Sequence, residues 1–156
     1  MKRREIREHL FKALFRRDFY SKKEIGEQGQ FYFEFQFEDE LKESEMECKV
    51  SKKDEELILK RLDDIMEKLP QINRLLDEAA DKWELSRMAK VDLTLLRLSL
   101  FEIMFDRDVP VAVAINEAVE LAKKYGGDSS PSFINGILAN CIKIQEVKDV
   151  MEHKGE

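Results

Sequence analysis

The sequence predicts an all-α fold, and three observations favour this class over a β-rich one. Its 156 residues include only 6 Gly and 3 Pro, too few for the many tight turns of a sandwich or barrel. Apolar residues recur at helical spacing along most of the chain. The composition, 43% hydrophobic and 38% charged, is that of a globular protein with a highly charged surface. We therefore expect a single domain over residues 1–156, long enough to fold without a metal or a disulfide.

The first helix is expected over residues 3–20, which contain neither Gly nor Pro. At about 100° per residue, its core stripe spans an arc of roughly 100°. This stripe consists of Ile6, Leu10, Ala13 and Leu14.

Aromatic and basic side chains lie beside this stripe. Phe11 and Phe15 fall outside the arc, and Arg4 and Arg7 fall next to them. The helix therefore either packs on two sides or exposes aromatic surface flanked by guanidinium groups.

The segment that follows carries no clear helical pattern. Two glycines predict a loop at residues 24–30, and residues 38–50 are acidic and polar, which also indicates a loop. Residues 31–37 alternate like a strand, but the chain offers no second strand to pair with, so we expect them to be helical or irregular.

Three helices are expected in the middle of the chain. The first covers residues 52–69 and ends at Pro70, which suits the first turn of a second helix over 70–82. The third covers 86–106, begins near Ser86 as a cap, and has no wide polar face, which is typical of a central buried helix.

Two further helices follow Pro110. One ends at Gly126-Gly127, a typical C-terminal stop. The last begins at residues 128–131, with a serine cap and a proline in its first turn. The charged tail, about 147–156, is expected to be frayed.

Two charged residues interrupt the apolar helix over 86–106. Arg97 and Glu102 are five apart and face different sides, so each needs a partner elsewhere if it is buried. The next helix offers Asn116, Glu117 and Glu120. We predict a structural ion pair formed by Arg97, Glu102 and Glu117; the alternative is a charged patch that faces a partner.

Catalytic and metal chemistry find no support in the sequence. His9 and His153 are not spaced with Cys48 or Cys141 as metal ligands are. No Gly-rich phosphate loop follows a strand, and no carboxylate pair stands out from ordinary helix surface. We therefore expect no enzyme, no cofactor and no metal. Two unpaired cysteines, no export segment and no apolar stretch long enough for a bilayer predict a cytoplasmic protein.

The charge distribution points to nucleic acid, although the net charge is −6. Residues 1–23 carry nine basic and three acidic side chains, whereas the remainder carries 18 basic and 30 acidic ones. At the other end of the chain, Phe133 lies in the first turn of the last helix, just after Ser129. A ring beside the positive end of a helix suits a stacked base and its phosphate, which indicates single-stranded nucleic acid.

Five motifs follow one another along the chain: WELSRM (83–88), VD (91–92), LRLSLFE (96–102), VAINEAVELAK (113–123) and FINGIL (133–138). In this order and spacing they resemble the NusB family of bacterial transcription antitermination factors. The basic start of the first helix, with Arg3, Arg4 and Arg7, resembles that family as well.

The resemblance implies about seven helices in two three-helix halves that form one domain. It also implies binding of a single-stranded RNA element, boxA, together with the ribosomal protein NusE, in antitermination complexes on RNA polymerase in rRNA operons. Asp92 stands where the family places an acidic residue facing NusE. The implied RNA-binding residues are Lys2, Arg3, Arg4, Arg7, Phe15, Asp128, Ser129 and Phe133.

Two departures and three alternatives accompany this resemblance. The family usually has tyrosine at the position of Phe15, and the loop from Asp128 appears one residue longer than in some relatives, so Asp128 and Ser129 are interchangeable candidates. The alternatives are a helical adaptor that binds protein only, an RNA-modifying enzyme, which the length of the chain disfavours, and a homodimer that covers the RNA face. The RNA assignment requires that the basic helix and the start of the last helix lie side by side.

Overall fold

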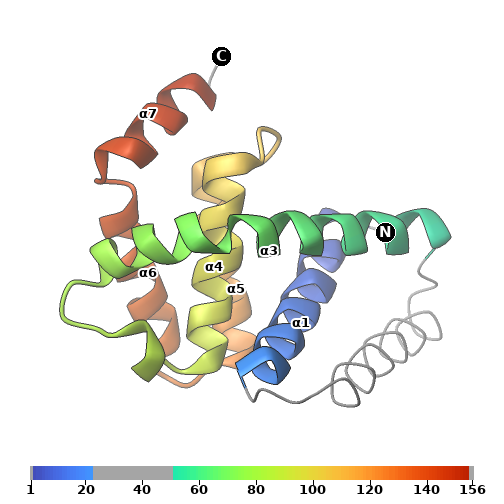
Figure 1. Cartoon of the computed structure of the whole chain (residues 1–156), viewed down its shortest axis with the longest axis horizontal. Helices are drawn as coiled ribbons and strands as arrows, with labels where there is room; N and C mark the ends of the chain where they lie inside the picture. The colour runs from blue at the N-terminus through green and yellow to red at the C-terminus, as the bar shows by residue number, and fades with distance from the viewer. Residues whose placement is uncertain (1, 23–50, 155–156) are drawn as a thin grey trace. The chain divides into compact units, whose positions relative to one another are not determined.

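The computed structural model describes residues 2–22 and 51–154. These residues form α-helices and one short 3-10 helix, with no strand among them, which confirms the expected all-α class (Figure 1). The expectations for residues 24–50 fall outside the described residues. The chain divides into an N-terminal unit, Met1–Met66, and a C-terminal unit, Glu67–Glu156.

The N-terminal unit contains α1 (Arg3–Lys22) and the first part of α3 (Lys52–Ala80). The Ser51 hydroxyl accepts a hydrogen bond from the Asp54 N–H (3.1 Å), which caps the start of α3. Arg17 and Asp63 join the two helices by an ion pair of 3.2 Å. The buried apolar side chains are Leu10, Phe11, Ala13 and Leu14 of α1, and Ile58, Leu62 and Ile65 of α3.

Helix α3 runs without interruption through Pro70, so the expected break into two helices is wrong. Proline lacks an N–H and its ring crowds the carbonyl four residues earlier, at a cost of about 3 kcal/mol in a helix interior. Ile72, Leu75 and Leu76, the three large apolar residues that follow, are fully buried, and each contributes roughly 1.5–3 kcal/mol. Core packing thus outweighs the lost hydrogen bond.

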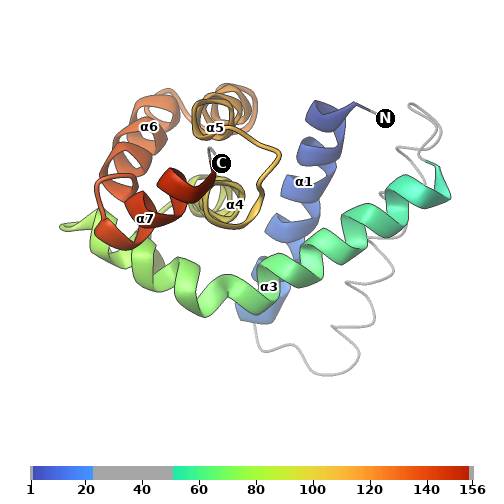
Figure 2. The same ribbon diagram turned by 90° about the horizontal axis from the view of Figure 1, so that it is seen from above.

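Helix α4 (Lys90–Phe105) occupies the centre of the C-terminal unit. It packs against α5 (Val111–Tyr125), α6 (Ser130–Cys141) and α7 (Gln145–Lys154), as Figure 2 shows. Every residue from Asp92 to Met104 is buried, which confirms a central helix without a wide polar face.

Two local expectations about this unit are wrong. The helix expected to begin near Ser86 begins at Lys90, because Ser86 lies within the separate 3-10 helix η1 (Leu85–Arg87). The tail expected to fray forms α7, because its Val147 side chain is fully buried.

Helix α7 also closes the end of α4. The Lys154 ammonium donates hydrogen bonds to the carbonyls of Glu102 (2.8 Å) and Ile103 (3.2 Å), which lie in the last turn of α4. A cation is favourable there because the C-terminal end of a helix is negative. Burial lowers the pKa of Lys154, while the nearby carboxylates of Asp106 and Glu102 act to raise it.

Candidate nucleic-acid interface

The start of α1 presents basic side chains to solvent. Lys2, Arg3 and Arg4 are exposed, and Arg7 is half-buried. Cations are unfavourable at a helix N-terminus, whose partial charge is positive, and only Glu5 has the sign that stabilises this first turn. Helix stability therefore does not account for the basic residues, and their exposed side chains are accessible to an external anion.

The two rings of α1 differ in exposure. The Phe11 and Phe15 centroids are 6.2 Å apart with the rings inclined at 44°. Phe11 is buried, so on that side the helix packs into the core, whereas Phe15 is half-buried and retains exposed surface. Of the two rings, Phe15 is the one that can take part in a surface contact.

At the start of α6, the first residue of the helix, Ser130, packs closely against the preceding loop at Gly126 and Gly127. The Ser130 hydroxyl is buried and accepts a hydrogen bond from the Gly127 N–H (3.1 Å). A Cβ atom at Gly126 would lie 2.6 Å from the Ser130 side chain, so glycine is needed there for space. Helix α5 ends at Tyr125 with Gly126 as its C-cap, which confirms the expected glycine stop, and Gly126 has a φ of −94°.

Ser129 occupies the N-cap position of α6, as expected, but its side chain does not cap the helix. Ser129 has helical backbone angles and makes no side-chain capping bond, because the inward-facing Ser130 takes over the connection to the preceding loop. Asp128 and Ser129 are both exposed. They lie directly before the first turn of α6, where the positive end of the helix favours anions.

Phe133 lies in this first turn and is half-buried. Its N–H donates to the Ser129 carbonyl (3.0 Å), which starts the helical hydrogen-bond ladder. Its ring meets the Trp83 ring in an edge-to-face contact, with centroids 5.4 Å apart at 81°. Trp83, 56% exposed, did not emerge as a functional residue from the sequence, since a contact between residues fifty positions apart leaves no local pattern.

The candidate residues thus fall into two sets. The first set lies in the N-terminal unit: Lys2 directly precedes α1, and Arg3, Arg4, Arg7 and Phe15 belong to it. The C-terminal unit brings together the other three, Asp128, Ser129 and Phe133, at the start of α6. That the two sets lie side by side and form one continuous RNA-binding surface stays a prediction.

Asp92 lies in the first turn of α4 and is only 8% exposed. Its buried Oδ1 accepts no hydrogen bond from the residues that the structure describes. A buried carboxylate oxygen without a donor is costly, and an incoming donor would relieve that cost.

Arg97, Glu102 and Glu117 are all buried, as a structural role requires. The Arg97 Nε donates to the Asn73 side chain on α3 (2.9 Å), a partner that the sequence did not indicate. Of the other acceptors expected on α5, Asn116 is exposed and Glu120 pairs with Lys123 at 3.0 Å. The ion pair among the three buried charges stays a prediction.

An open groove of about 540 Å³ runs between α5 and α6. Its walls are largely apolar, with a polar contribution from two asparagines and a serine. The lining residues are Ala112, Ile115, Asn116, Val119, Pro131, Ser132 and Asn135.

Within residues 2–22 and 51–154 no group of three or more His, Cys, Asp or Glu side chains is placed to hold a metal ion. In the same ranges no helix is long and apolar enough to cross a membrane. Burial raises the pKa of the Cys141 thiol to about 12, so this cysteine remains protonated within the core.

Comparison with known proteins identifies relatives along nearly the whole chain. A model of the NusB family matches residues 4–143. The transcription antitermination protein NusB of Lachnoclostridium phytofermentans is 53% identical over 142 residues, covering 91% of this chain and 99% of the relative. The protein of the same description from Agathobacter rectalis is 43% identical over 139 residues, covering 89% and 98%. A solved structure of T. maritima NusB superposes with a TM-score of 0.75 at 36% identity, covering 97% and 98% of the two chains.

Proposed function

Since this chain belongs to the NusB family of transcription antitermination proteins, we propose that it binds a single-stranded, boxA-like RNA element together with the ribosomal protein NusE. In this role it promotes antitermination in rRNA operons, as a non-catalytic component of a complex on RNA polymerase in the cytoplasm.

The observation that carries the RNA assignment is the exposed basic start of α1. Lys2, Arg3 and Arg4 project charge from a helix end that cations destabilise. Phosphate groups of the RNA would contact these exposed cations, and the half-buried Phe15 on the same helix would supply a ring for a base.

The start of α6 supports the same ligand. Phe133 offers a second ring, and Asp128 and Ser129 are exposed beside the positive end of the helix. Both surfaces contact the same RNA strand in this proposal, α1 chiefly through phosphates and α6 chiefly through a stacked base.

The C-terminal unit offers features suited to a protein partner. Asp92 holds a buried carboxylate oxygen that has no donor among the described residues, and a basic side chain of NusE would supply one. The apolar groove between α5 and α6 provides further surface for a protein contact. If RNA binding fails in experiment, this groove is the feature that favours an adaptor which binds protein only.

Charge reversal at α1 tests the RNA assignment. We expect Arg3→Glu with Arg4→Glu to weaken binding of a fluorescent boxA-like RNA at least tenfold, measured by anisotropy with and without NusE. Each phosphate contact in single strands contributes roughly 0.7 to the slope of log affinity against log salt. Loss of two contacts should therefore lower that slope by about 1.4.

The matched control is Lys143→Glu with Lys148→Glu, which makes the same charge change at exposed positions beyond the far end of α6. Its affinity should stay within about threefold of the parent, and both double variants should keep their helical circular dichroism. Equal weakening by both variants would mean a general charge effect. Absence of saturable binding by the parent chain at low salt, with and without NusE, would refute RNA recognition.

A further inference from the structure

Trp83 is an exposed ring that the proposed RNA contacts leave unused. It is the one tryptophan of the 156-residue sequence, and 56% of its surface is exposed. Tryptophan side chains usually gain stability by burying most of their large apolar area. An exposed indole beside a proposed binding surface therefore calls for a functional account.

The backbone holds this side chain in a defined position. Asp81, directly after α3, adopts a left-handed conformation with a φ of 52°, a region that Asp tolerates better than most residues with a side chain and that ends the helix sharply. The turn is closed by a hydrogen bond from the Trp83 N–H to the Ala80 carbonyl (3.0 Å), and η1 begins two residues later. Because its backbone is fixed on both sides, little backbone entropy remains to be lost on binding.

The contact with Phe133 places the indole next to the start of α6. The two rings stand at 81° with centroids 5.4 Å apart. A base cannot lie flat against two perpendicular rings at once. If Phe133 stacks on one base, the exposed face of Trp83 is available to the neighbouring base of a splayed strand.

The surroundings of Trp83 are polar, which favours a nucleotide over an apolar protein surface. Lys82, Glu84, Ser86 and Arg87 are all exposed. Arg87 and Glu84 form an ion pair of 3.4 Å, and their side chains are 81% and 69% exposed. An ion pair this exposed contributes little to stability, so an RNA phosphate can replace the Glu84 carboxylate as the partner of Arg87.

We propose that Trp83 is a second stacking platform for the RNA, taking an unpaired base adjacent to the one on Phe133. This inference rests on the proposed RNA-binding function. It gives a role to Trp83, which the motifs contain but to which neither they nor the charge pattern assigned a function.

The native fluorescence of Trp83 tests the contact without a label on the protein. Saturating boxA-like RNA should quench the emission and reduce its quenching by acrylamide at least twofold, because the stacked base covers the indole. Emission and acrylamide access that stay unchanged, while anisotropy shows the RNA to be bound, would overturn the proposal.

Two substitutions separate stacking from apolar packing. Trp83→Leu should weaken RNA binding about tenfold, in keeping with the usual contribution of one stacked base, whereas Trp83→Phe should stay within about threefold of the parent. Val113→Ala, which truncates another exposed apolar residue of the same unit, should bind as the parent does. Thermal unfolding monitors whether the fold is retained in each variant.

The outcomes distinguish this inference from the function on which it rests. Equal affinities of the parent chain and Trp83→Leu would refute the stacking platform and leave RNA binding intact. Equal weakening by Leu and Phe would also refute it, because Phe retains a flat aromatic face. A parent chain that binds no RNA refutes the proposed function and with it this inference.

Discussion

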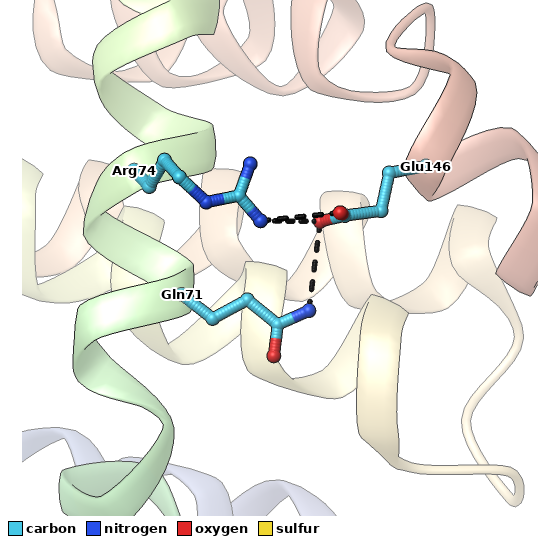
Figure 3. A network of polar contacts seen from close by, with 3 residues as sticks. All are labelled: Gln71, Arg74 and Glu146. Atoms are coloured by element: carbon cyan, nitrogen blue, oxygen red, sulfur yellow. Dashed lines mark hydrogen bonds and ion pairs between the residues drawn. The ribbon is translucent and has the colours of Figure 1, made fainter.

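Arginines occupy two contrasting regions of the C-terminal unit, the interior around α4 and the surface between α3 and α7. Arg97 of α4 is 5% exposed and donates to Asn73. Arg74 of α3 has a side chain that is 58% exposed and reaches Glu146 of α7 at 2.9 Å, where Gln71 donates to the same carboxylate (Figure 3).

The contrast shows that the length of a hydrogen bond alone does not reveal how much a charged side chain contributes to the stability of the fold. The two arginines make side-chain contacts of equal length, yet one is held in a medium where a lost partner cannot be replaced by water. The basic residues at the start of α1 resemble Arg74 in their exposure, so we expect them to contribute to ligand binding more than to folding.

Removal of the buried arginine should have the largest effect. We expect Arg97→Ala to lower the free energy of unfolding by about 3 kcal/mol, since it deletes a buried cation and leaves its polar partners without a donor. Urea denaturation followed by circular dichroism measures this change. As a control, Arg107→Ala, at an exposed position just after α4, should change stability by less than about 0.5 kcal/mol. Similar losses of stability in both variants would mean that burial does not set the contribution of these arginines.

Removal of the partner of Arg97 should have an intermediate effect. Asn73→Ala leaves the buried Nε of Arg97 without its acceptor and should cost about 1.5 kcal/mol in the same measurement. Asn73→Asp keeps an acceptor oxygen and should retain most of the stability. If Asn73→Asp and Asn73→Ala destabilise the protein equally, the contribution of Asn73 to stability does not come from its hydrogen bond with Arg97.

The exposed arginine should have the smallest effect. Arg74→Ala removes a pair whose side chains are both well exposed and should cost no more than about 0.5 kcal/mol. The difference from the parent chain should shrink further in 1 M salt, where exposed charges are screened within about 3 Å. A loss of more than about 1 kcal/mol in the free energy of unfolding that persists in high salt would mean that Arg74 contributes to stability as a buried charge does.

Most helices could be predicted from sequence because each carries a local apolar pattern. The uninterrupted apolar run of α4 correctly indicated a buried central helix. Pro70 was misleading, because its local preference for a helix start was outweighed by the burial of the residues after it. The final segment was misjudged for a similar reason, since one buried valine, Val147, anchors a sequence that is otherwise charged.

The candidate site was predictable only where its signal is local. The basic cluster at the start of α1 is visible in the sequence because its residues lie within one or two helical turns. The roles of Ser130 and Trp83 were not visible, because they arise from contacts with backbone and rings brought close by folding. Phe133 was predicted in the first turn of its helix from the local serine and proline signals, and the structure confirms that position.

Helix α7 begins after residue 143, where the match to the family model ends. A chain trimmed to the matched residues would lose the Lys154 ammonium that binds the last carbonyls of α4, the Glu146 carboxylate that pairs with Arg74, and the fully buried Val147. Apolar surface of α4 would then be open to solvent and prone to self-association. Recombinant forms intended for assembly with RNA and NusE should therefore extend through Lys154.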